Sequence, residues 1–253
     1  MILHTNNELN NLEIQDIVYN PSNKIELEGS IEILEEVIRT INKNTETYLL
    51  FCHLLSVAYQ KMIENEYWID KKVVKYLKKS IYYCNEISKN CPKVVNNKEF
   101  SINQYVAMLE EANCLAKLAD YENKEENYKK SLKLYDTVIK NTRDTQAKYL
   151  SIMNKSKLQI IIYEKNIKSF KEINKNLYKL NQAILTLKES LNFFKQYEEL
   201  EKNCFICLSN IQRARSINKS FTRYYFNIYM KYKPSKYDKI NRIKTYKFEV
   251  IYD

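Results

Sequence analysis

The sequence predicts an all-α fold of nine antiparallel helices, and three observations carry this prediction. The 253 residues include a single glycine and three prolines, so the chain has few of the residues that tight β-turns require. Apolar residues recur every three or four positions in segment after segment. Short polar breaks separate these segments, which is typical of antiparallel helices joined by short connections.

Three of the first five predicted helices have a recognisable start or end. Asn20-Pro21 ends the first helix, and Thr45 or Thr47 can cap the third. The fourth is expected to stop before Pro92, because proline disfavours the helical conformation in the residue before it. These helices cover residues 8–19, 24–42, a stretch from Thr45 or Thr47 through Met62, 68–90, and 101–119.

The last four predicted helices complete the bundle. The polar break NTRD precedes the seventh helix, and the stretch FFKQY separates the eighth from the ninth. A tetratricopeptide array would need a regular period with small residues and proline at fixed offsets. One glycine and helices of unequal length argue against that array. These four helices cover residues 124–140, 144–165, 167–192 and 197–217.

Charge divides the chain into two parts. The net charge is +10, with 41 Lys and Arg against 31 Asp and Glu. Residues 218–253 contain seven lysines, two arginines and seven tyrosines, but only three acidic residues. We therefore expect a helical domain over residues 1–217 and a basic, Tyr-rich C-terminal tail over residues 218–253.

Other features of the sequence narrow the class of protein. No apolar run reaches the roughly 20 residues that span a bilayer, and the N-terminus does not resemble a signal peptide, so we expect a cytoplasmic protein without membrane contact. The pair Cys204 and Cys207 has no second pair of ligands, so we expect reduced, packed thiols and no metal or cofactor. Two distant histidines and no glycine-rich loop argue against an enzyme.

Four segments in chain order resemble the 14-3-3 proteins, the dimeric adaptors that bind phosphoserine and phosphothreonine peptides. The most specific is LLSVAY, from Leu54 to Tyr59, which is similar to the start of the third helix of that family. The other three are NCLAKLA at 113–119, AKYLSIMNKS at 147–156 and CLSNIQ at 207–212. The resemblance covers about residues 8–217 and implies a cup of nine antiparallel helices with a concave peptide groove.

On this resemblance the phosphate pocket is degenerate. A phosphate is best held by paired arginines and a hydroxyl donor. The family's cationic and hydroxyl positions fall here on uncharged side chains, although Lys61 lies beside one of them, and the acidic residue that braces the pocket is kept as Glu110. The positions are Gln60, Lys61, Tyr67, Glu110, Asn113 and Cys114. We expect weakened phosphate recognition, with Lys61 and Lys157 as substitute cations.

The peptide-backbone contacts of the groove are matched better. An asparagine amide can donate to one backbone group of an extended peptide and accept from another. The two asparagines that do so in the family correspond to Asn154 and Asn210. Groove-lining positions fall on Met153, Lys157, Ile206 and Ala214. The resemblance therefore implies phosphorylated or extended peptide segments of client proteins as partners.

Assembly and the tail keep alternatives open. The family dimerises, but region 68–100 is shorter here, which puts the homodimer in question.

Ser216, Ser220 and Ser235 have basic neighbours and are possible phosphosites that could dock the tail in a groove. The alternative function is a helical-repeat scaffold, or a nucleic-acid-binding protein that acts through the basic tail, where lysines and tyrosines interleave. No nucleic-acid motif supports that alternative.

Overall fold

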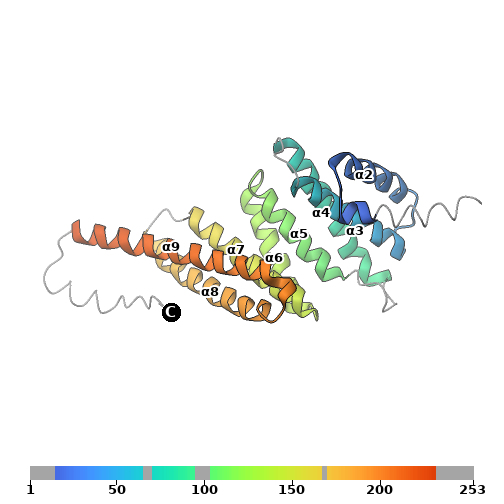
Figure 1. Cartoon of the computed structure of the whole chain (residues 1–253). Helices are drawn as coiled ribbons and strands as arrows, with labels where there is room; N and C mark the ends of the chain where they lie inside the picture. The colour runs from blue at the N-terminus through green and yellow to red at the C-terminus, as the bar shows by residue number, and fades with distance from the viewer. Residues whose placement is uncertain (1–14, 65–69, 95–102, 167–169, 232–253) are drawn as a thin grey trace, which may run out of the picture. The chain divides into compact units, whose positions relative to one another are not determined.

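A computed structural model of the chain describes residues 15–64, 70–94, 103–166 and 170–231. Every regular element within these ranges is a helix, which confirms the all-α class. Residues 15–19 are helical and belong to the first predicted helix. The elements that follow are α2 (Lys24–Ile38), α3 (Glu46–Glu64), α4 (Asp70–Val94), α5 (Gln104–Leu118), α6 (Lys124–Asn141), α7 (Thr145–Asn166), α8 (Phe170–Phe194), the 3₁₀ turn η1 (Glu198–Leu200) and α9 (Glu201–Lys231) (Figure 1).

The chain divides into two compact units, Met1–Leu158 and Gln159–Asp253, and the boundary falls inside α7. In the first unit α2 packs against α3, α3 against α4, α4 against α5 and α5 against α6 (Figure 1). In the second unit α8 packs against α9. Packing between consecutive helices is therefore confirmed within each unit. The predicted boundary between the helical domain and the tail, after residue 217, lies inside α9.

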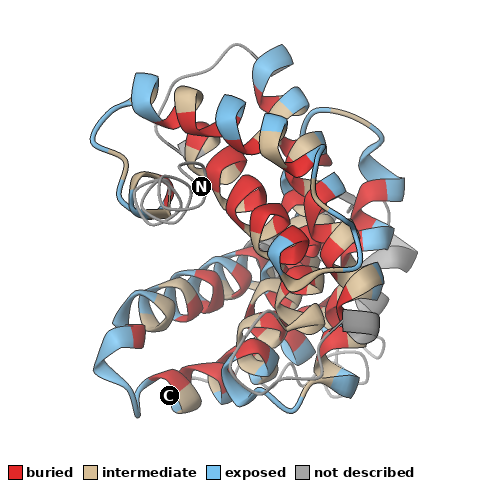
Figure 2. Cartoon of the chain, turned by 90° about the vertical axis from the view of Figure 1, so that its right-hand side faces the viewer, coloured by how far each residue is buried: buried red, intermediate tan, exposed pale blue. Residues whose placement is uncertain are grey.

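The LLSVAY segment lies in the core of the first unit. Leu54, Leu55, Ala58 and Tyr59 are each at most 4% exposed, whereas Val57 is half-buried. These side chains join apolar residues of α2, α4 and α5 in one continuous core. Figure 2 shows the same pattern in other helices whose burial is coloured, with buried residues along one side and exposed residues along the other. The apolar half of α3 is thus an element of packing.

The starts of four helices carry the side-chain caps that satisfy free backbone N–H groups. Thr45, rather than Thr47, caps α3, because its Oγ1 accepts a hydrogen bond from the Tyr48 N–H at 3.2 Å. Asn23, Asn103 and Asp144 do the same for α2, α5 and α7, accepting from backbone N–H groups at 2.9 to 3.1 Å. Of these four caps, that of α3 was predicted from the sequence.

Three predicted helix ends are wrong. Helix α2 ends at Ile38, four residues before the predicted end at residue 42. Helix α4 continues through Pro92 to Val94, because proline near a helix end removes only one backbone donor while the preceding Cys91 is buried in the core. Helix α9 continues past residue 217 to Lys231. Just after residue 217, the Asn218 side chain donates a hydrogen bond to the side chain of Asn181 of α8 at 3.0 Å. No glycine or proline follows before Pro234.

The second unit is held by the facing sides of α8 and α9. Leu180, Leu187 and Phe194 of α8 are fully buried, and they recur at the seven-residue spacing of two helical turns. On α9 the corresponding stripe includes Cys207 and Ala214, both fully buried. Arg213 of α9 also forms an ion pair with Glu164 near the end of α7. The apolar period of each helix therefore runs along the side that faces the other helix.

Candidate functional site

Asn113 on α5 is the centre of a polar cluster that joins three helices of the first unit. Its side-chain Oδ1 accepts a hydrogen bond from Asn154 of α7 at 2.9 Å and another from the Tyr135 hydroxyl of α6 at 2.7 Å. Its amide group donates to Glu110, one turn earlier on α5, at 3.4 Å. We call these four residues the Asn113 cluster. Three of them were predicted site residues, and Tyr135 was not.

A second set of polar contacts lies beside the Asn113 cluster and joins α3, α4 and α5. Ser80 of α4 is fully buried, and its hydroxyl lies 3.2 Å from the Ser56 carbonyl oxygen and 3.4 Å from the Cys114 Sγ. Gln60 of α3 donates its side-chain amide to Ser80 at 3.3 Å. Burial raises the pKa of the Cys114 thiol to about 11, so the thiol stays protonated at neutral pH.

These contacts show what the predicted phosphate positions do within the fold. Gln60, Asn113 and Cys114 all bond to protein groups, and Cys114 is only 1% exposed. Lys61 is half-buried at the end of α3, and Lys157 is exposed on α7. Tyr67 lies outside the described residues. Lys61 and Lys157 are therefore the residues that carry a positive charge among the described pocket positions and the proposed substitute cations.

The predicted groove residues divide between the two units. Met153 of α7 is 2% exposed and Ala214 of α9 is fully buried, so both pack inside the protein rather than line a surface. Asn210 is also buried, and its side-chain amide donates to the Ile206 carbonyl of its own helix at 2.8 Å. Ile206 is half-buried. Asn154 belongs to the first unit and Asn210 to the second.

The predicted phosphosites have different surroundings. Ser216 is exposed on α9, three residues after Arg213. That arginine is held by Glu164, so it is engaged within the second unit. Ser220 lies within α9, and Ser235 lies outside the described residues.

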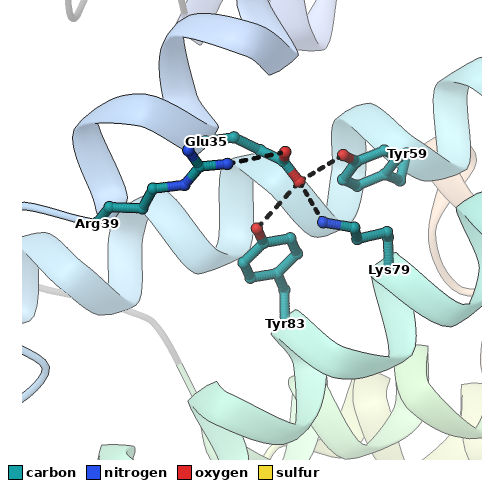
Figure 3. A network of polar contacts seen from close by, with 5 residues as sticks. All are labelled: Glu35, Arg39, Tyr59, Lys79 and Tyr83. Carbon is teal, nitrogen blue, oxygen red and sulfur yellow. Dashed lines mark hydrogen bonds and ion pairs between the residues drawn. The ribbon is translucent and has the colours of Figure 1, made fainter.

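A further polar network, which was not predicted from the sequence, has Glu35 of α2 as its shared acceptor (Figure 3). Its Oε1 accepts from the Tyr59 hydroxyl and the Lys79 ammonium at 2.7 Å each, and from the Tyr83 hydroxyl at 3.3 Å. Burial alone would raise the pKa of Glu35, but the hydrogen bonds from Lys79 and Tyr59 outweigh it, so the pKa is lowered. The network ties α2 to α3 and α4.

The signals that could have revealed Tyr135 and Ser80 are positional. Ser80 occupies a core position in the regular series Val73, Leu77, Ser80, Cys84 and Ile87, all of which are buried on α4. A serine inside such a series needs a partner from a neighbouring helix. Tyr135 stands between Ser131 and Val138 on the buried face of α6 in the same way.

Other kinds of site have no support in the described part of the chain. All six cysteines are free thiols, and no group of three or more His, Cys, Asp or Glu side chains among the described residues could hold a metal ion. None of the described helices is both long enough and apolar enough to cross a membrane.

Comparisons of the chain with protein-family models, curated proteins and solved structures found no match. The resemblance to 14-3-3 proteins therefore rests on the four sequence segments.

Proposed function

We propose that the chain is a non-catalytic adaptor of 14-3-3 type that binds extended peptide segments of client proteins and has a weakened phosphate pocket. In this proposal it is a cytoplasmic protein that works as a homodimer, and the helices form a cup with the peptide in its concave groove. The observation that carries the proposal is the hydrogen bond between Asn113 and Asn154. It joins two residues 41 positions apart that the resemblance assigns to one binding groove.

The weakened phosphate pocket is supported by the engagement of its predicted residues within the protein. Asn113 already accepts two hydrogen bonds, and Gln60 donates to Ser80. Cys114 is buried and its thiol is protonated, so it presents no positive charge to an anion. Each charge-assisted hydrogen bond to a phosphate is worth about 1.5–3 kcal/mol, so losing several of them removes most of the preference for a phosphorylated ligand.

Recognition of the peptide backbone is supported by the position and bonding capacity of Asn154. A side-chain amide has two N–H donors and one acceptor oxygen. The bond to Asn113 uses one donor and fixes the orientation of the amide, which is half-buried. A second donor beside an acceptor is the combination that pairs with the alternating C=O and N–H groups of an extended peptide.

The test is a titration followed by fluorescence anisotropy with one labelled peptide of the type Arg-Ser-x-Ser-x-Pro, with and without phosphate on the second serine. We expect the two forms to bind within about tenfold of each other, which corresponds to about 1.4 kcal/mol. Asn154→Ala should weaken both forms equally. The double variant Lys61→Gln and Lys157→Gln should weaken the phosphorylated form alone. Asn192→Ala, an exposed asparagine on α8, is the matched control.

Each alternative has its own result. Binding of the phosphorylated peptide about a hundredfold more tightly would mean that other cations have rebuilt the pocket. An Asn154→Ala variant that binds like the wild type would show that the groove assignment is wrong. If single-stranded RNA binds with steep salt dependence while neither peptide binds, the alternative function through the basic residues 218–253 is favoured.

A further inference from the structure

The exposed side of α4 carries a shallow basic hollow. Helix α4 contains seven lysines and only two acidic residues. Six side chains at positions three or four residues apart line the hollow, so they share one face of the helix. They are Lys71, Val74, Lys75, Lys78, Lys79 and Tyr82. The α4 hollow lies outside the Asn113 cluster, since none of these residues belongs to it.

Two lysines of the α4 hollow are neutralised within the first unit. Lys78 forms an ion pair with Glu122 at 2.8 Å, and Lys79 forms one with Glu35 at 2.7 Å. Lys71 and Lys75 are exposed, and neither has a partner among the described residues. One turn of helix separates them, so their Cα atoms lie about 6 Å apart along the axis of α4. The fold therefore leaves two adjacent cations uncompensated at one end of the hollow.

The hollow also has an apolar part. Val74 is half-buried and packs against the small apolar cluster beneath α4, while Tyr82 is 50% exposed. The ring of Tyr82 contacts the ring of Tyr83 edge to face, with 5.1 Å between the ring centroids. The aliphatic stems of the lysines extend the apolar surface between these two side chains. An apolar strip bordered by cations is thus exposed on one helix face.

We propose that the α4 hollow binds an acidic amphipathic helix of a partner protein. Apolar side chains of the partner would pack on Val74 and Tyr82, while its carboxylates would pair with Lys71 and Lys75. Charge complementarity is the argument for this occupant, because the two uncompensated cations lie at one end of an apolar strip and the whole chain is strongly basic. This second binding surface does not depend on the peptide groove.

The experiment uses the full chain and a labelled amphipathic helical peptide whose leucine stripe is flanked by glutamates. Its counterpart, with glutamine in place of every glutamate, tests the need for charge. We expect saturable binding of the acidic peptide that weakens as salt is raised, and at least about tenfold weaker binding of the glutamine peptide. The double variant Lys71→Glu and Lys75→Glu should bind the acidic peptide at least about tenfold more weakly than the wild type.

A matched control separates this surface from the overall positive charge. Lys129 and Lys133 are exposed on α6 with the same four-residue spacing, so Lys129→Glu with Lys133→Glu changes the net charge equally. The control variant should keep wild-type affinity, and circular dichroism should show that both variants are folded. Tyr82→Ala should weaken binding without changing its salt dependence.

Three results would overturn the proposal. The first is no saturable binding of the acidic peptide at low salt. The second is an equal loss of affinity in the α4 and α6 variants, which would show that only net charge matters. The third is binding of a labelled poly(U) oligonucleotide at this surface, sensitive to Lys71→Glu with Lys75→Glu, without binding of the peptide.

Discussion

The side-chain amide of Asn154 on α7 donates to the side-chain oxygen of Asn113 on α5 at 2.9 Å, and the Tyr135 hydroxyl shares the same acceptor. One oxygen thus joins three helices of the first unit. Tyr135 is almost fully buried, at 2% exposure, so its hydroxyl has no ready access to water. Replacement of Asn113, the acceptor, should therefore lower the stability of the fold as well as affect peptide binding.

We predict that Asn113→Ala lowers the free energy of unfolding by about 1–3 kcal/mol, because it leaves the buried Tyr135 hydroxyl without its acceptor. Urea unfolding followed by circular dichroism measures this. Asn154→Ala should cost less, since Asn113 still accepts from Tyr135. A double variant whose cost equals the sum of the two single costs would show that the two asparagines do not interact.

Glu35 gives a second prediction, because one carboxylate accepts from Tyr59, Tyr83 and Lys79 (Figure 3). Glu35→Ala should lower the free energy of unfolding by about 1–3 kcal/mol, since it removes the acceptor of two largely buried hydroxyls. Glu32→Ala, which removes an exposed carboxylate from the same helix, is the control and should have little effect.

The lowered pKa of Glu35 adds a dependence on pH. Because its pKa is lower in the folded chain than the ordinary value of 4.5, the stabilisation is present above that value and is lost as the pH falls through the folded pKa. Glu35→Gln should therefore reduce the fall in melting temperature between pH 5 and more acidic solutions. An unchanged acid profile would contradict the assigned network.

We predict that the stability contributed by Glu111 depends on pH in the opposite direction to that of Glu35. It is buried on α5 with a 3.4 Å hydrogen bond from Asn85, and burial outweighs that bond and raises its pKa above 4.5. The folded chain then holds this proton more tightly, so the stability that Glu111 contributes declines as the pH rises through its folded pKa. Glu111→Gln should raise the melting temperature at pH 7 more than at pH 4. Glu125→Gln, at an exposed site on α6, should show no such difference.

The LLSVAY segment gives a prediction about packing. Leu55 is fully buried, so Leu55→Ala should cost about 2–5 kcal/mol of unfolding free energy through lost burial and the cavity that remains. Val57 lies in the same segment but is half-buried, and Val57→Ala should cost only about 1 kcal/mol. Equal costs at the two positions would contradict the orientation of α3.

Much of the fold could be predicted because helix formation depends on local features. Apolar spacing and polar caps identified the helices from α2 onwards, and the side chain of Thr45 shows that such a cap was correctly anticipated. The helix ends at Pro92 and at residue 217 were missed, since packing of Cys91 and the contact between Asn218 and Asn181 extend the helices beyond their local signals.

The candidate site was less accessible to prediction. The resemblance brought Asn113 and Asn154 into one hypothesis, but the spacing of residues in the sequence says nothing about which hydroxyl will reach a given acceptor. Tyr135 therefore went unnoticed, as did the pairing of Glu35 with Lys79. Such contacts depend on how helices are rotated and shifted against each other, which many distant residues set together.

Backbone preference and apolar periodicity are local properties, so the order of amino acids is enough to predict that this chain is helical and where most of its helices begin. The partners of the polar side chains depend instead on the packed fold, in which Asn113, Cys114 and Gln60 bond within the protein, and Lys71 and Lys75 stay exposed while Lys78 and Lys79 are paired. A polar side chain takes its partner from whichever helix packs beside it, and that neighbour is fixed by the whole core.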